Sequence, residues 1–127
     1  MDVECGDLFS IFKRKDESLF FCGKISSLIH SNVPKFLIQE RITQISCGSE
    51  HCLILVNNNQ VLSLGENKFG ELGTGDLKFR TEFTIILREE TKSIGCGNYF
   101  SLVLYKNEEL LSFGNNDVVK TIFHFQN

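Results

Sequence analysis

The sequence predicts an all-β fold, a partial β-propeller of about three blades with four antiparallel strands each. Three observations support this prediction. A pattern that starts with Cys-Gly and ends with Gly occurs three times, every copy holds two short apolar runs around a polar turn, and no longer segment shows the 3.6-residue period of a helix. Short antiparallel strands that recur in groups of four are typical of propeller blades.

The repeat is defined by the spacing of cysteine and glycine residues. The segments CGDLFSIFKRKDESLFFCG, CGSEHCLILVNNNQVLSLG and CGNYFSLVLYKNEELLSFG align without a gap, and the last glycine of each lies eighteen residues after the cysteine. The equivalent residues are Cys5, Cys47 and Cys96, then Gly6, Gly48 and Gly97, and finally Gly23, Gly65 and Gly114. Three ungapped copies establish a repeat from this sequence alone.

Each copy is expected to form a β-hairpin. The runs CLILV and VLSLG, like their equivalents, are too short for helices and enclose a polar turn such as NNNQ, where Asn tolerates positive φ. A third strand is expected before Cys-Gly, in RITQISCG and TKSIGCG. A fourth is expected in PKFLIQE, RTEFTIIL and VVKTIFHF. The segment ISSLIHSNV is expected to form a loop or a single helical turn.

Length and composition indicate one domain over residues 1–127, with units at about 1–40, 41–88 and 89–127. The formal net charge is −3, and basic residues are scattered except for KRK at 13–15, which is interpreted as a solvated hairpin tip. No basic stripe that would neutralise several phosphates is present. Nucleic-acid binding is therefore disfavoured.

Several features favour an intracellular protein, cytoplasmic or nuclear. The first residues, MDVECGDLF, lack the positive region and the long apolar stretch of a signal peptide. No window approaches the ~18 consecutive apolar residues of a membrane span. The five cysteines are an odd number, which favours free thiols in a reducing compartment.

The middle copy, ISCGSEHCLILVNNNQVLSLGENKFGELGTGD, resembles a repeat of the regulator of chromosome condensation family, whose members are usually seven-bladed propellers. The matching positions are Cys47, Gly48, His51, Gly65, Asn67, Gly70 and Gly73. The outer copies keep Cys-Gly and the last glycine, but they lack GELG and carry Phe9 and Phe100 in place of the histidine. Leu64 stands where the family usually has tryptophan. The resemblance covers nearly the whole chain and is strongest in the middle.

The same residues suggest no catalytic, cofactor or metal site. No Gly-Lys-Ser/Thr and no helix follow the glycines of the middle copy, so these are interpreted as turn residues. His51 and Cys52 would point to opposite faces of a strand, and no second Cys/His cluster completes four zinc ligands. Cys5, Cys47 and Cys96 are therefore interpreted as buried structural thiols, and His51 as hydrogen-bonded to backbone. Carboxylate pairs such as Glu89-Glu90 are interpreted as solvated, so no enzyme activity is expected.

The function expected first is a non-catalytic protein-interaction module, because repeats of this type present loops from blades. The resemblance implies an alternative, a guanine-nucleotide exchange factor, or a fragment of one, for a small Ran-like GTPase. A further alternative is the substrate-binding part of a ubiquitin-ligase-type protein. Three blades leave open faces at both ends of the arc, so the chain is expected either to self-associate, most simply as two arcs that make a six-bladed ring, or to need further blades from a longer polypeptide.

Overall fold

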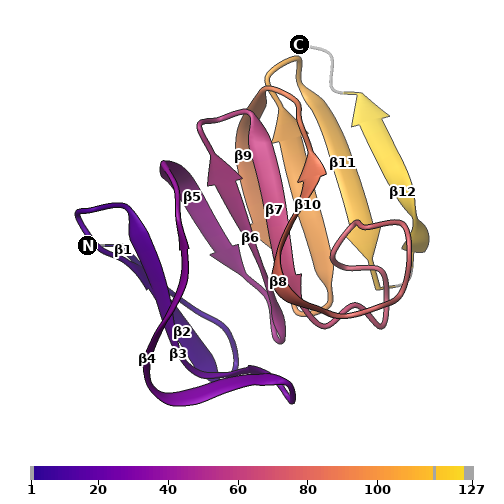
Figure 1. Cartoon of the computed structure of the whole chain (residues 1–127). Helices are drawn as coiled ribbons and strands as arrows, with labels where there is room; N and C mark the ends of the chain where they lie inside the picture. Colours follow the sequence, from indigo (N-terminus) through magenta and orange to yellow (C-terminus); the bar gives the residue numbers. More distant parts are fainter. Residues whose placement is uncertain (1, 116, 125–127) are drawn as a thin grey trace.

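The computed structural model describes residues 2–115 and the backbone of residues 117–124. Within them, twelve strands form three antiparallel sheets of four (Figure 1). The first sheet contains β1 (Asp2–Cys5), β2 (Phe9–Lys13), β3 (Ser18–Ser26) and β4 (Ile29–Gln39). The second contains β5 (Ile42–Cys47), β6 (His51–Val56), β7 (Gln60–Gly65) and β8 (Arg80–Leu87). The third contains β9 (Thr91–Cys96), β10 (Phe100–Tyr105), β11 (Glu109–Gly114) and β12 (Asp117–His124).

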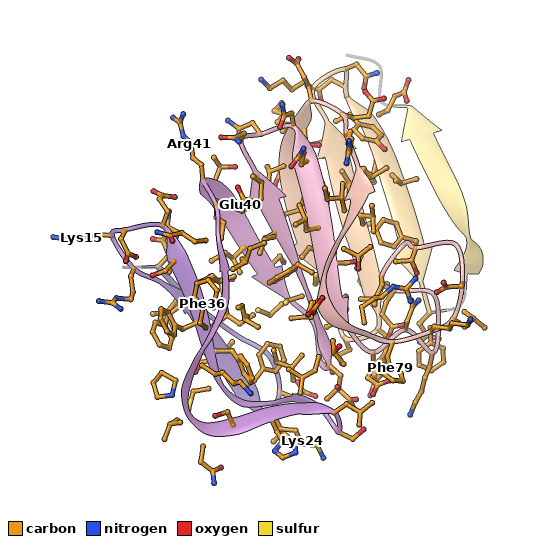
Figure 2. The ribbon with its side chains drawn as sticks, viewed as in Figure 1. Lys15, Lys24, Phe36, Glu40, Arg41 and Phe79 are labelled. Atoms are coloured by element: carbon orange, nitrogen blue, oxygen red, sulfur yellow. The ribbon has the colours of Figure 1, made fainter. Side chains whose placement is uncertain are left out.

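The predicted all-β class, with three four-stranded antiparallel blades, is confirmed. One local prediction is wrong: the segment 25–33 is neither an irregular loop nor a helical turn, because β3 runs to Ser26 and β4 starts at Ile29. The KRK segment does lie at a hairpin tip, and Lys15 projects away from the ribbon there (Figure 2). The fourth strand predicted for the third copy ends at Phe125, which lies outside the described residues.

The three hairpins share one register, which explains the invariant last glycine of the repeat. Gly65 pairs with His51, as Gly23 pairs with Phe9 and Gly114 with Phe100. Gly65 has a φ of 120°, and an added Cβ would lie 2.3 Å from the carbonyl oxygen of Glu50. A side chain at this position would therefore be strained and would clash with the backbone, so only glycine fits at this end of the hairpin.

The core lies between the sheets and forms two layers. Side chains of the first and second sheets make one layer around Ile11 and Ile54, and side chains of the second and third make another around Leu53 and Val103. In Figure 1 the second sheet lies between the other two. All six residues of β6 are buried, because both faces of its sheet are covered.

Candidate protein-interaction surface

An aromatic ring packs against the glycine of the Cys-Gly pair in each copy. A Cβ added to Gly48 would lie 2.2 Å from Cε1 of His51, and the same construction on Gly6 and Gly97 meets the rings of Phe9 and Phe100 at 2.0 Å. The glycines of neighbouring sheets also touch, since the added Cβ of Gly48 would lie 2.6 Å from the carbonyl oxygen of Gly97. The first glycine of the repeat therefore makes room for a ring and for the next sheet.

His51 joins the second sheet to the third. Its side chain is fully buried, and its Nε2 lies 2.9 Å from Oγ of Ser101. The Ser101 hydroxyl donates to the carbonyl oxygen of Glu71 at 2.7 Å, so it accepts the hydrogen bond from Nε2–H of His51. Burial lowers the pKa of His51 to about 4, although a hydrogen bond with the Phe100 backbone acts in the opposite direction. The imidazole is therefore neutral near pH 7.

The loop 66–79 follows β7 and lies against the third sheet (Figure 1). Its anchor is Asn67, whose side chain is fully buried. The amide Nδ2 lies within 3.2 Å of four oxygen acceptors on Thr74, Asp76 and Lys78, and Oδ1 accepts from the backbone N–H of Leu72. One asparagine thus connects both halves of the loop.

The GELG segment packs loop 66–79 against the second and third sheets. Gly70 and Gly73 have φ values of 80° and 69°, in the left-handed region that glycine adopts easily. Leu72 is fully buried, and its carbonyl oxygen accepts a hydrogen bond from Ser63 Oγ at 2.8 Å. A Cβ on Gly73 would lie 2.7 Å from the ring of Phe113 in the third sheet. The loop is therefore packed between two sheets.

An ion pair closes the far end of the loop. Nη2 of Arg80 lies 2.8 Å from Oδ2 of Asp76, while Oδ1 accepts from Oγ1 of Thr74 and from the N–H of Lys78. These contacts, with the hydrogen bond from Arg80 first, hold the pKa of Asp76 well below its usual range. Asp76 is therefore ionised at neutral pH and orders the loop before β8.

Two aromatic rings stand exposed on this frame, and we call them the aromatic pair. Phe69 on the loop and Tyr99 in the turn before β10 have ring centroids 5.3 Å apart and are 36% and 38% exposed. The turns beside them are tied together, because Ser49 N–H donates to the carbonyl of Asn98 and Ser49 Oγ donates to Asp7. One end of all three sheets thus presents a connected surface.

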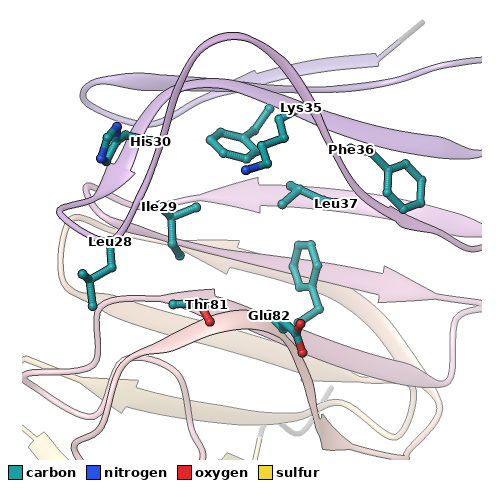
Figure 3. Close-up of a pocket in the computed structure, with 10 residues that line it drawn as sticks. Leu28, Ile29, His30, Lys35, Phe36, Leu37, Thr81 and Glu82 are labelled. Atoms are coloured by element: carbon teal, nitrogen blue, oxygen red, sulfur yellow. The ribbon is translucent and has the colours of Figure 1, made fainter.

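A pocket of about 320 Å³ lies elsewhere, between β4 and β8. In Figure 3, Lys35 and Leu37 point toward its middle from β4, and Thr81 and Glu82 line the opposite side from β8. The lining mixes apolar side chains with charges of both signs, so it indicates no single class of ligand.

The three repeat cysteines are less buried than predicted, and Cys5 differs most. All five are free, as expected, but Cys5 is exposed, and its predicted burial is wrong. Cys47 and Cys96 are half-buried, because each packs into the layer against the preceding sheet. No described sheet covers β1 on that side. Burial raises the pKa of Cys96 to about 11 and, with Cys96 nearby, raises that of Cys47 further.

The described residues contain no group of three or more His, Cys, Asp or Glu side chains that could hold a metal ion. Over the same part of the chain, no helix has the length and apolar character needed to span a membrane. Two further residues join neighbouring sheets, Ser101 and Gln44, and no pattern in the sequence predicts this role for them. The Gln44 side chain accepts from the N–H of Ile94 at 3.0 Å and donates to its carbonyl at 3.1 Å.

Comparison with known proteins agrees with this architecture. The family model for the regulator of chromosome condensation (RCC1) repeat matches residues 42–71 and 92–118. The secretion-regulating guanine nucleotide exchange factor of Bos taurus is 38% identical over 68 residues, which make up 54% of this chain and 14% of that protein. The chain therefore spans about a seventh of the length of this curated relative.

Two solved structures share the fold. Human WBSCR16 has a TM-score of 0.81 at 15% identity, over 97% of this chain and 37% of that one. Prp20p from Saccharomyces cerevisiae, described with its binding properties to Gsp1p and histones, has a TM-score of 0.72 at 20% identity, over 89% of this chain and 32% of that one. At these identities the likeness concerns the fold alone, a partial β-propeller.

Proposed function

We propose that this protein, a chain of regulator of chromosome condensation repeats, is a non-catalytic protein-interaction module that binds its partner at the aromatic pair. The observation that carries the proposal is the exposure of Phe69 and Tyr99 side by side on a loop and a turn that are otherwise closely bonded. Aromatic side chains on surfaces of this kind are enriched among the residues that contribute most to protein–protein affinity.

The frame around the pair supports tight binding. Asn67 and Asp76 already order loop 66–79 in the free protein through their hydrogen bonds. Less conformational entropy is therefore lost when a partner binds, which leaves more of the contact energy for affinity. Lys68 and Asn98, the neighbours of the aromatic residues in sequence, are exposed and polar. An apolar centre with a polar rim is the usual anatomy of such interfaces.

The proposal is tested with a double variant, Phe69→Ala with Tyr99→Ala, and a control, Val33→Ala, whose side chain is 65% exposed on β4 in the first sheet. Each chain is immobilised, and the proteins it retains from an extract of the source cells are quantified by mass spectrometry. We expect the wild-type chain and the control to retain the same proteins, and the double variant at least tenfold less with an unchanged melting temperature. Equal retention by all three chains would reject the proposal.

The second candidate function is guanine-nucleotide exchange on a small Ran-like GTPase. It is favoured by the 38% identity to a protein named as an exchange factor. Against it, exchange as the family resemblance implies uses a broad face of a complete ring and a protruding wedge, and the described residues form three blades. Release of labelled nucleotide from several small GTPases decides between the two. We expect no acceleration at micromolar protein; clear acceleration would establish exchange.

A substrate-binding role beside a ubiquitin-ligase domain would use the same surface, and specific retention of ubiquitin-pathway enzymes in the capture experiment would favour it. An intracellular location, cytoplasmic or nuclear, is part of the proposal. The five free cysteines support it, because free thiols persist in reducing compartments.

A further inference from the structure

We infer that two copies of this chain associate head to tail, so that the third sheet of each copy packs on the first sheet of the other. This goes beyond the proposed function, because it concerns a different surface and a different partner. The inference rests on equivalent positions in the repeat. Those positions are buried where two sheets meet within the chain, and they are half-buried or exposed at its two outer faces.

The junction between the second and third sheets shows what a filled interface contains. The second sheet contributes a face that we call trailing, and all of its side chains are at most 1% exposed: His51, Leu53, Leu55, Val61 and Ser63. The third sheet contributes a face that we call leading, with side chains at most 3% exposed: Ser101, Val103, Leu111 and Phe113. These two faces together form the second core layer.

The trailing face of the third sheet repeats that of the second. Its residues at the equivalent positions are Phe100, Leu102, Leu104, Leu110 and Ser112. Phe100 is 40% exposed, whereas Phe9 and His51 at the same position are 5% and 0% exposed. The other four are only partly buried. The trailing face of the third sheet is therefore as apolar as the buried face of the second sheet, but its side chains are accessible to solvent.

The leading face of the first sheet matches the other half of the junction. Its residues Ser10, Phe12, Phe20 and Cys22 are half-buried and stand where the third sheet has Ser101, Val103, Leu111 and Phe113. The two Phe side chains are larger than their counterparts and Cys22 is smaller, so the changes partly compensate in volume. Val3 is 55% exposed, whereas the equivalent Ile45 and Ile94 are 9% and 5% exposed.

The polar contacts of the junction can also be repeated between copies. Within the chain, Ser49 N–H donates to the carbonyl oxygen of Asn98 at 3.0 Å. Between copies, Asn98 takes the place of Ser49, and Asp7 of the second copy takes the place of Asn98. At the junction of the first and second sheets a side chain joins the turns instead, since Ser49 Oγ donates to Oδ2 of Asp7 at 2.8 Å, and the amide Nδ2 of Asn98 can donate to Asp7 of the second copy in the same way.

A second copy satisfies both outer faces at once. The two faces are opposite halves of one junction on a single chain, so a half-turn rotation joins the trailing face of each copy to the leading face of the other. The product has six sheets, within the four to eight blades at which propellers usually close. No outer face of the described sheets then remains uncovered, which is the physical reason to prefer a second copy.

The test uses sedimentation of the full chain over a concentration series. Wild-type protein is expected to shift from 14.5 kDa toward twice that mass. Leu104→Glu on the trailing face and Phe12→Glu on the leading face should each give a monomer. Leu77→Glu, the same change at a loop residue that is 59% exposed, should still dimerise. Circular dichroism confirms that each variant remains folded.

Mixing the two monomeric variants distinguishes head-to-tail association from other dimers. In a mixed dimer, one junction carries both glutamates and the other carries none. Leu104→Glu mixed with Phe12→Glu should therefore form a heterodimer. If the wild-type dimer were instead joined through two like faces, mixing the variants would not restore dimer formation. Cys5 gives a second readout that needs no variant. Its labelling by a maleimide should slow at least tenfold as wild-type concentration rises, because the second copy covers β1.

A wild-type monomer at every concentration, with constant Cys5 labelling, would overturn the inference and leave the two faces to further sheets, of the same polypeptide or of another. Dimers of both glutamate variants would overturn it as well, because they would place the contact elsewhere. Failure of the capture experiment at the aromatic pair would leave this inference intact, since neither Phe69 nor Tyr99 belongs to the two outer faces.

Discussion

Nε2 of His51 lies 2.9 Å from Oγ of Ser101, and this hydrogen bond crosses from the second sheet to the third. The Ser101 hydroxyl in turn donates a hydrogen bond to the carbonyl oxygen of Glu71 in loop 66–79. The repeat histidine therefore fixes two things together, the packing of neighbouring sheets and the position of the loop that carries Phe69. Its neutral, buried state makes both sensitive to pH.

The first prediction is a loss of stability in mild acid. In the unfolded chain His51 takes up a proton near pH 6.5, whereas in the folded chain burial lowers its pKa to about 4. Between these two pH values the unfolded state binds one more proton than the folded state. The contribution of neutral His51 to stability is therefore complete above pH 6.5 and is lost as pH falls toward 4. At ~1.4 kcal/mol per pH unit, the loss is on the order of 3 kcal/mol.

The measurement is chemical denaturation at several pH values, compared with His51→Phe, which copies the residue found at this position in the other two repeats. The difference in unfolding free energy between the two chains should decrease as pH falls from 6.5 to 4. Carboxylates titrate in both chains and cancel in this difference. A difference that does not change with pH would mean that His51 is protonated equally in both states.

The second prediction concerns close packing at Gly48. Its φ is not positive, so a side chain would be excluded by contact alone: an added Cβ would lie 2.2 Å from the His51 ring and 2.6 Å from the backbone of Gly97. The Gly97 backbone cannot give way without moving the third sheet, so Gly48→Ala should cost at least ~2 kcal/mol of unfolding free energy.

Gly95→Ala is the matched control, because an added Cβ there meets nothing within 4 Å. This change should be neutral, or should stabilise by ~0.4–1 kcal/mol through the unfolded chain. Thermal and urea unfolding of the two variants provide the comparison. Similar midpoints for both would show that the sheets shift readily at Gly48.

The strands could be predicted from the sequence because their causes are local. Apolar runs of four to five residues around NNNQ predict the hairpin of β6 and β7 at its observed position. The partners of His51 and Gln44 could not be predicted, since Ser101 and Ile94 lie about 50 residues away and belong to the next sheet. Burial of Cys5 was predicted from its equivalents, but equivalence in sequence does not supply the neighbouring sheet that buries Cys47 and Cys96.

The third prediction is that Asn67 holds loop 66–79 in place. Asn67→Ala removes the acceptor for the N–H of Leu72 and the donor for several carbonyl and side-chain oxygens. Each buried polar group left without a partner costs ~1–3 kcal/mol, so the free energy of unfolding should fall by roughly 2–4 kcal/mol. Amide exchange of Leu72 should accelerate by more than that of Ile54 in β6.

Asn59→Ala in the exposed turn after β6 serves as the control and should change neither quantity by more than ~0.5 kcal/mol. If Asn67→Ala melted at the wild-type temperature with Leu72 still protected, the hydrogen bonds of this asparagine would not be what orders the loop. The aromatic pair would then need another explanation for its fixed position.

The last prediction is the order in which the thiols react in dilute protein. Cys5 is exposed, Cys47 and Cys96 are half-buried with raised pKa values, and Cys52 is fully buried with a pKa well above its usual value because of its burial. Only the thiolate reacts, so access and pKa act in the same direction. Mass-spectrometric mapping after short exposure to a maleimide should find Cys5 modified first and Cys52 only on unfolding. Modification of Cys52 at the rate of Cys5 in folded protein would show that the first and second sheets separate readily in solution.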